Sequence, residues 1–379
     1  MPASSRQQVA QQTAKKLSEA AKSLPGIKAF IGLDGFVDEI IAVVDKRTSF
    51  ESFEPIQTIG QLGQKILNAA GQSSNYELIT RQMKLGGNGP IMANALASFG
   101  LAVTYVGSLG YPALHPVFQE MAGRAKVISI AEAGHTDALE FEDGKLMLGK
   151  ITCLNEVTWA NLVDRVGGAD KLRSMVDEAT LFGFVNWTML PHLSDIWERL
   201  RSEIMPKVSS KPRKFFVDLC DPEKRTHADI EKAMKILTGL QASVDVILGL
   251  NLKESLAILE VLGLAAPKDH EAAIEETAKA IRQLLKIFCC VVHPRGGAAA
   301  ATAAASAKFA GPFVKQPRIS TGAGDHFNAG FATGQVLGFS LEESLCVGVG
   351  TSGYYVRTGI SPAAKQLAEF VAELPAPQE

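Results

Sequence analysis

Short hydrophobic runs and amphipathic stretches alternate along most of this chain. The hydrophobic runs are nearly continuous, which is typical of strands buried on both faces. They fall at Ala29–Leu33, Val103–Val106, Thr180–Val185, Phe215–Asp218, Val244–Leu248 and Ile287–Val292. Helical periodicity occurs between them, at Gly89–Phe99, Leu193–Ile204, Ala228–Leu240, Leu252–Leu262 and Ala272–Leu285. The pattern predicts an α/β fold with a mostly parallel sheet covered by helices on both faces.

Both ends of the chain are predicted to be helical. Three consecutive helices are expected at Asp325–Leu337, Leu341–Arg357 and Ala363–Ala372. Near the start, Val9–Leu24 is rich in lysine, glutamine and alanine, so residues 1–26 are expected to form an exposed N-terminal helical extension.

Two regions interrupt the alternation with shorter, more polar strands. These are Phe36–Val44 with Tyr76–Lys84, and Asp137–Phe141 with Lys145–Lys150 across an Asp-Gly turn, which is a hairpin signal. Ile59–Ala70 has a helical pattern and predicts an inserted helix. We therefore expect a second, smaller sheet.

Composition excludes several classes of function. The 379 residues are 46% hydrophobic and 21% charged, with a formal charge of −2, so neither a nucleic-acid partner nor an anionic membrane surface is indicated. No apolar run reaches the ~18 residues of a membrane span, and no leader pattern opens the chain. The five cysteines form no C-x-x-C pair, so reduced thiols in a cytoplasmic protein are expected.

The segment from Ser320 to Phe331 joins a glycine-rich turn to an acid at the start of an apolar helix. In Gly322-Ala323-Gly324 the small residues let backbone N–H groups approach an anion, and the positive end of the helix dipole points to the same place. The carboxylate of Asp325 could accept the proton of an attacking hydroxyl. An anion site beside a base suits phosphoryl transfer to an alcohol. The alternative is that Asp325 only caps the helix.

Three motifs in order resemble those of the ribokinase-like (PfkB) carbohydrate kinases. T-G-A-G-D-x-F-x-A-G-F looks like the C-terminal motif of that family. Leu85–Pro90, followed by Ala93–Gly100, is similar to its N-terminal diglycine segment, and Asn251–Glu254 to its N-x-x-E motif. The likeness runs from about Lys28 to about Pro362.

The resemblance implies a ribokinase-like three-layer α/β/α fold with a small β-sheet lid over the sugar. Residues 27–35, 87–135 and 151–375 would form the nucleotide- and substrate-binding core, and 36–86 with 136–150 the lid. It also implies an ATP-dependent kinase that uses Mg²⁺. A monovalent cation and a homodimer through the lid are left open.

For the acceptor, carboxylates at the carboxyl end of a strand bind hydroxyls well, which favours Asp34 and Asp38. By resemblance, Asp34 is the early sugar-binding acid and Gly86-Gly87 the diglycine at the lid hinge. Where the family usually has asparagine, this chain has Ile91, with Asn88 nearby. Either Asn88 takes over the contact or the acceptor lacks that hydroxyl.

For the nucleotide, the resemblance implies that Asn251 and Glu254 reach phosphates and Mg²⁺, Glu254 through water, because Mg²⁺ keeps its water shell. The two residues also have the spacing of a capping box, and both roles could hold together. Arg295 and Gly297 lie where the family has a glycine turn near the nucleotide, and Thr321 is assigned to the same side.

Three rival classes of protein differ from a sugar kinase in the sequence features that they require. A nucleoside kinase would share every motif and differ only in the acceptor pocket. A non-catalytic sugar- or nucleotide-binding protein would usually have lost the base or the anion turn. A dinucleotide-dependent oxidoreductase would need G-x-G-x-x-G after the first strand, and Gly32–Phe36 lacks it.

Overall fold

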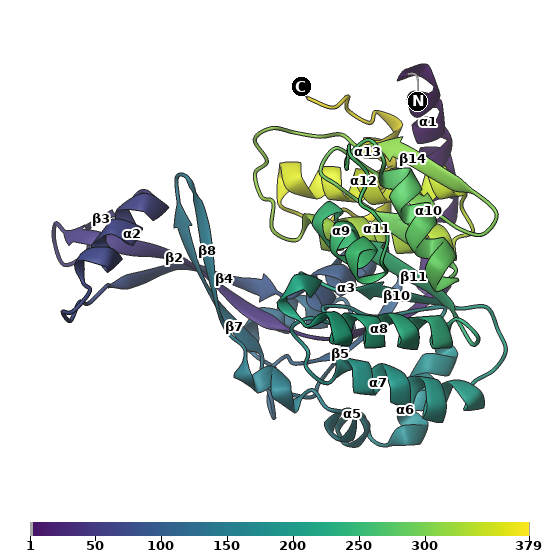
Figure 1. Cartoon of the computed structure of the whole chain (residues 1–379), viewed down its shortest axis with the longest axis horizontal. Coiled ribbons are helices and arrows are strands. Elements are labelled where there is room, and N and C mark those ends of the chain that lie inside the picture. The colour runs from purple at the N-terminus through teal and green to yellow at the C-terminus, as the bar shows by residue number, and fades with distance from the viewer. Residues whose placement is uncertain (1–2, 379) are drawn as a thin grey trace.

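A nine-stranded sheet forms the body of the protein, and a five-stranded sheet projects from one side of it (Figure 1). The computed structural model describes residues 3–378. The strand order of the large sheet is β14-β13-β12-β11-β10-β9-β1-β5-β6. Its strands are β1 (Lys28–Leu33), β5 (Ala102–Gly107), β6 (Lys126–Ser129), β9 (Leu181–Phe184), β10 (Lys214–Asp218), β11 (Asp245–Leu250), β12 (Cys289–Val292), β13 (Gly297–Ala301) and β14 (Ser306–Ala310). Only the β12–β13 and β13–β14 pairings are antiparallel, so the predicted mostly parallel sheet is confirmed.

Helices cover both faces of this sheet, as the alternation predicts (Figure 1). One layer contains α5 (Trp159–Val166), α6 (Ala169–Glu178), α7 (Leu193–Arg199), α8 (His227–Leu240), α9 (Leu252–Val261) and α10 (Ile274–Leu285). The other contains α1 (Ala3–Ala20), α3 (Asn88–Phe99), α4 (Gln119–Ala122), α11 (Ala323–Val336), α12 (Leu341–Thr358) and α13 (Ala364–Ala372).

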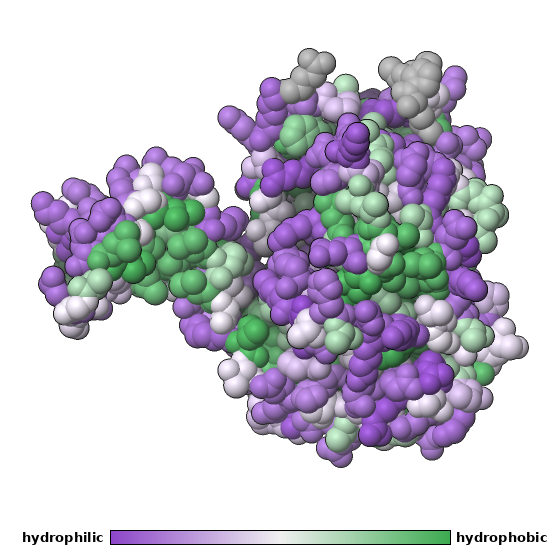
Figure 2. Space-filling model, viewed as in Figure 1, coloured by the Kyte–Doolittle hydropathy of each residue, from purple (hydrophilic) through white to green (hydrophobic). Residues whose placement is uncertain are grey.

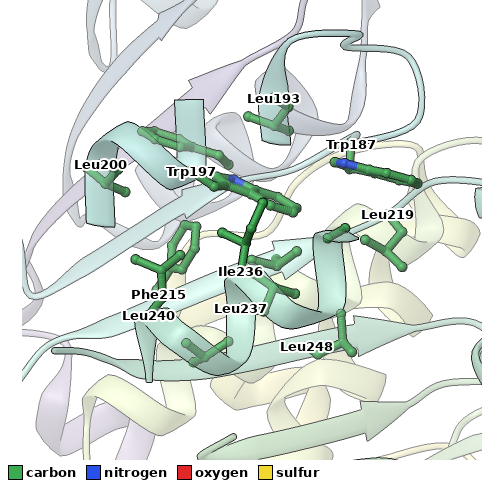
Figure 3. Close-up of a cluster of buried hydrophobic side chains, with 14 of the residues drawn as sticks. Trp187, Leu193, Trp197, Leu200, Phe215, Leu219, Ile236, Leu237, Leu240 and Leu248 are labelled. Atoms are coloured by element: carbon green, nitrogen blue, oxygen red, sulfur yellow. The ribbon is translucent and has the colours of Figure 1, made fainter. Parts of the chain in front are cut away.

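An aromatic cluster anchors the first layer to the sheet (Figure 3). Trp197 of α7 meets Phe215 of β10 edge to face, with ring centroids 6.3 Å apart, and Phe182 stacks on Phe215 at 4.6 Å. All three side chains are fully buried. Truncation of Trp197 to alanine would therefore cost about 3–5 kcal/mol of stability.

The small sheet has a hydrophobic core of its own. It consists of β2 (Phe36–Arg47), β3 (Phe53–Pro55), β4 (Leu78–Gly86), β7 (Gly134–Phe141) and β8 (Gly144–Lys150). The predicted inserted helix is present as α2 (Ile59–Asn68), and its Leu62 packs on Ile41, Val43 and Leu139. Figure 2 shows hydrophobic side chains gathered on the projecting sheet. Its exposed large hydrophobic residues include Leu78, Met83, Met147 and Leu148.

The expectation of an exposed N-terminal extension is wrong. α1 packs on α12 and α13, and its Ala10, Ala14 and Leu17 are buried. The guanidinium of Arg6 donates to the carbonyl of Pro375 across 2.8 Å, and Lys16 pairs with Glu343 at 2.7 Å. Small alanines make this buried face hard to recognise in a sequence of lysines and glutamines.

Several elements differ from the sequence prediction. α5, α6 and β6 were not predicted, since all three are short, with eight, ten and four residues. The helix expected over Leu193–Ile204 becomes a wider π-helical turn from Leu200. The alanine-rich run Ala298–Ala307 lies in β13 and β14, which form a pair of antiparallel strands.

Candidate active site

The carboxyl ends of neighbouring strands carry the polar side chains of the site. Asp34 follows β1, Asn186 follows β9 and Asp218 ends β10. Since these strands are parallel and adjacent, the three residues meet at one edge of the sheet, where open α/β sheets bind ligands. Above this edge, α11 contributes Asp325 and Asn328, and the Asn328 amide donates to Asp218 across 2.8 Å.

Asp34 is buried and holds the first turn of α3. Its carboxylate accepts hydrogen bonds from the backbone N–H of Asn88 at 2.9 Å, that of Gly89 at 2.8 Å and the side-chain amide of Asn186 at 2.8 Å. Burial raises the pKa of Asp34 to about 6, and these hydrogen bonds oppose the rise. The carboxylate therefore fixes the segment that carries Asn88.

Asp38 lies on β2, next to the diglycine hinge. Its carboxylate contacts Gly86, where a side chain would collide with it. Gly87 is the N-cap of α3 with φ 94°, a backbone conformation that favours glycine. Burial raises the pKa of Asp38, and the opposing charge of Lys84, its partner on β4, is the next largest influence.

Asp325 is not the cap of its helix. The N-cap of α11 is Gly322 with φ 90°, and Asp325 is the third residue of the helix. The interpretation of Asp325 as a simple helix cap is therefore wrong. Its carboxylate is buried and accepts a hydrogen bond from the side-chain amide of Asn88 across 2.9 Å. Burial raises the pKa of Asp325 to about 8, Asn88 lowers it, and the charges of Asp34 and Glu254 add to the rise.

The predicted anion turn begins α11. Gly322, Ala323 and Gly324 are its N-cap and first two residues, where backbone N–H groups and the helix dipole face outward. The N–H of Ala323 also donates to the carbonyl of Ser320 at 3.2 Å. The hydroxyl of Tyr355 donates to the carbonyl of Thr321 at 3.0 Å, which anchors the turn to α12.

His326, in the variable position of the motif, braces the same turn. Its Nδ1 lies 2.7 Å from the carbonyl oxygen of Gly322 and its Nε2 lies 2.8 Å from the hydroxyl of Ser361. Its ring stacks on Tyr355 with centroids 3.6 Å apart. Burial lowers the pKa of His326 to about 4, so the ring is neutral and Nδ1 donates to Gly322. This geometry suits a structural role for His326.

A cavity of about 640 Å³ lies beside the turn. The predicted residues that line it are Asn88, Asn251, Glu254, Arg295, Gly297, Thr321, Ala323, Gly324 and Asp325. Apart from Gly322, the predicted catalytic and nucleotide-binding groups thus line one cavity. Asp34 and Asp38 lie outside its lining, and Asp34 is linked to it through Asn88.

Asn251 and Glu254 form the capping box of α9. The Asn251 side chain accepts from the Glu254 N–H at 2.9 Å, and Glu254 accepts from the Asn251 N–H at 2.8 Å. Glu254 also accepts from the N–H of Asp221 at 3.0 Å. Burial and the charge of Asp218 raise the pKa of Glu254. The capping role is therefore present, and it aims the carboxylate at the cavity that it lines.

Sequence patterns did not assign every group that shapes the site. The sequence places Asn186 and Asp218 at the carboxyl ends of predicted strands, but it does not identify their partners Asp34 and Asn328, which are distant in sequence. Lys145 of β8 donates to the hydroxyl of Thr321 at 3.2 Å, and the two residues are 176 positions apart. The sequence around Lys145 predicts a hairpin but does not indicate a contact with the site. Within residues 3–378, no cluster of three or more His, Cys, Asp and Glu side chains is arranged to hold a metal.

Comparisons with known proteins agree with this architecture. A family model described as prokaryotic ketohexokinase matches residues 6–374. The ketohexokinase of Haloferax volcanii is 30% identical over 369 residues, which cover 95% of this chain and 96% of that protein.

Solved structures show the same fold. A carbohydrate kinase from Agrobacterium tumefaciens aligns with a TM-score of 0.62 and 16% identity, over 93% of this chain and 98% of its own. Arabidopsis thaliana ribokinase complexed with ribose and ATP aligns with a TM-score of 0.61 and 17% identity, over 91% of this chain and 98% of its own.

The fold and these comparisons define a carbohydrate kinase with the ribokinase fold. This confirms the resemblance, the fold class and the enzyme class that the sequence predicts. More narrowly, the chain belongs to the prokaryotic ketohexokinase family. No helix in the part of the chain that the structure describes is long and apolar enough to cross a membrane.

Proposed function

We propose that this protein transfers the γ-phosphoryl group of Mg·ATP to a hydroxyl of a ketohexose, with Asp325 as general base. The observation that carries the proposal is the placement of the Asp325 carboxylate between the anion turn and Asn88. Ketohexose is the acceptor class suggested by the family and by the relative from Haloferax volcanii. A nucleoside acceptor remains the alternative, and no observation of this structure favours it.

The chemistry follows from the positions of the side chains. The acceptor hydroxyl would lie near Asp325, whose carboxylate takes its proton, while the backbone N–H groups of Gly322, Ala323 and Gly324 stabilise the charge on the transferring group. A pKa near 8 makes the ionised carboxylate a strong base but leaves much of it protonated at neutral pH. Asp34, Asp38, Gly86, Gly87 and Asn88 would form the acceptor side.

The nucleotide side fits a magnesium ion held indirectly. Glu254 and Asp218 are buried, and neither forms a salt bridge with a lysine, arginine or histidine of residues 3–378. Glu254 would therefore hold Mg²⁺ through water, since both of its oxygens already accept backbone N–H groups. When bound, the ion would offset phosphate charge. Asn251, Arg295, Gly297 and Thr321 would contact the nucleotide.

The small sheet is proposed as a lid over the acceptor, because Asp38 and Lys84 lie on it beside the hinge. We keep the proposed division into a core of residues 27–35, 87–135 and 151–375 and a lid of residues 36–86 and 136–150. The helix α1, expected as an extension within residues 1–26, packs on the core. A homodimer through the lid, a monovalent-cation requirement and a cytoplasmic location stay predictions.

The first experiment is ADP release from Mg·ATP across ketohexoses, aldoses, sugar acids, sugar phosphates and nucleosides. We expect turnover on ketohexoses, lowered about 10²–10⁴-fold in Asp325→Asn, which retains the volume and the hydrogen bond from Asn88. Asp170→Asn, at a side chain that is 93% exposed, is the matched control. Near-normal turnover by Asp325→Asn would show that Asp325 is not the general base. Turnover on nucleosides alone would show that the acceptor is a nucleoside and not a ketohexose.

A further inference from the structure

One lysine of the small sheet reaches the anion turn. Lys145 lies on β8, opposite Glu140 of β7 in the hairpin. Its Nζ donates to the hydroxyl of Thr321 across 3.2 Å, and Glu140 lies 3.8 Å from the same Nζ. Thr321 immediately precedes Gly322, the N-cap of α11. Lys145 therefore places a full positive charge at the residue beside the predicted anion site.

The sheet register shows which side of the small sheet this charge occupies. Asp38 pairs with Thr136, and Thr136 pairs with Gly149, four residues from Lys145 on the same strand. Paired residues share a face and strand residues alternate, so Lys145 shares its face with Asp38. Lys150 lies on the opposite face, where it donates to Asp137 at 2.8 Å.

Other positive charges near the site are those of Lys84, the partner of Asp38 on β4, and of Arg295 and Lys315 in the cavity lining. Asp34, Asp38 and Asp325 are all acidic, and the anion turn offers only the partial charges of backbone N–H groups. Phosphoryl transfer relies on positioning and on cations that stabilise the charge of the transferring group. An ammonium has three donors, and Thr321 uses one of those of Lys145.

We propose that Lys145 is a further catalytic residue that contacts the phosphoryl group as it is transferred, an inference that rests on the proposed kinase function. In that step, the acceptor oxygen forms a bond to the γ-phosphorus while the bond to the β,γ-bridging oxygen breaks. ADP leaves with the electron pair, and the hydroxyl proton passes to Asp325. Lys145 donates hydrogen bonds to the phosphoryl oxygens and keeps its own protons.

The test compares Lys145→Met with Lys145→Arg in the full-length enzyme. Removal of one positioned donor typically costs about 10²–10³-fold in kcat, so Lys145→Met should lose about 10²-fold with little change in the KM of ATP. Lys145→Arg restores the positive charge and should recover most of this loss. Lys150→Met, on the same strand but the other face, should behave as the unchanged enzyme. Thermal unfolding of each variant checks the fold.

A second readout separates a catalytic from a structural role. ADP with magnesium and aluminium fluoride mimics the transferring group, so Lys145→Met should bind this mixture, in the presence of acceptor, at least tenfold more weakly while binding ATP alone normally. A variant with full kcat, or one that raises only the KM of the acceptor, would overturn the assignment. If the unchanged enzyme turns over no sugar, the proposed function fails, and the catalytic role of Lys145 fails with it.

Discussion

The side-chain amide of Asn88 donates to the carboxylate of Asp325 across 2.9 Å, linking the first turns of α3 and α11. The two residues lie 237 positions apart, in the two motifs that resemble the acceptor and phosphate motifs of the family. Because this bond lowers the pKa of Asp325 against the effect of burial, it helps to keep the proposed base ionised.

Replacement of Asn88 by leucine should move the pH–rate profile. Loss of a hydrogen bond to the charged form is worth about 1.5–3 kcal/mol, so the pKa of Asp325 should rise by about one unit or more. The rising limb of kcat/KM against pH should shift to higher pH by that amount, and activity at pH 7 should fall about tenfold. Asn94→Leu, on the same helix, is the control. An unshifted pH–rate profile in Asn88→Leu would show that Asn88 does not influence the pKa of the base.

Ile91 should set which acceptors are used. Its Cδ1 and Cγ2 lie against Gly322, each 3.3 Å from where a Cβ would stand, so an apolar wall borders the anion turn. Ile91→Asn introduces the amide that the resembled family usually carries. We expect the ratio of kcat/KM values between acceptors to change about tenfold or more, with the KM of ATP unchanged. An identical acceptor profile in both enzymes would show that residue 91 does not face the substrate.

Much of this site could be predicted from the sequence, because short local motifs specify the turn, the strand end and the helix cap that carry its residues. Gly322-Ala323-Gly324-Asp325 specifies a left-handed turn and a helix start, and Asp34 follows a strand long enough to recognise. The spacing of Asn251 and Glu254 gives a capping box that the structure contains.

The remaining features depend on tertiary contacts. The amide of Asn186 reaches Asp34 only because β9 lies beside β1, and Lys145 meets Thr321 only because the β7–β8 hairpin brings it to the turn before α11. The packing of α1 was likewise missed, since its buried face combines Ala10, Thr13 and Ala14 with a single large apolar side chain, Leu17. Pairings between elements more than 150 residues apart leave no periodic signal.

The brace at His326 should matter to stability and to catalysis. Leucine at this position would remove one of the two donors of the Gly322 carbonyl, which keeps the backbone N–H of residue 326 at 3.1 Å, so the loss is about 0.5–1.5 kcal/mol and the anion turn would be loosened. We expect a lower melting temperature and a reduced kcat. Asparagine can place a donor near the position of Nδ1 and should recover much of both, whereas Ser361→Ala should have a smaller effect. Equal losses in the asparagine and leucine variants would mean that ring stacking on Tyr355, not the hydrogen bond, holds the turn.

The raised pKa of Asp325 also predicts that the proposed base destabilises the fold. The folded protein holds this proton up to about pH 8, whereas the ordinary carboxyl releases it near 3.8. Between these values the folded state binds more protons, so the free energy of unfolding falls as pH rises from about 4 to about 8. Asp325→Asn cannot ionise and should be more stable than the unchanged enzyme by an amount that grows across this window, on the order of a few kcal/mol at pH 8. Urea unfolding of both proteins at several pH values measures this difference, which also contains the change at Asp218, because the charge of Asp325 raises the pKa of Asp218. A difference that is constant with pH would mean that Asp325 ionises normally in the folded enzyme.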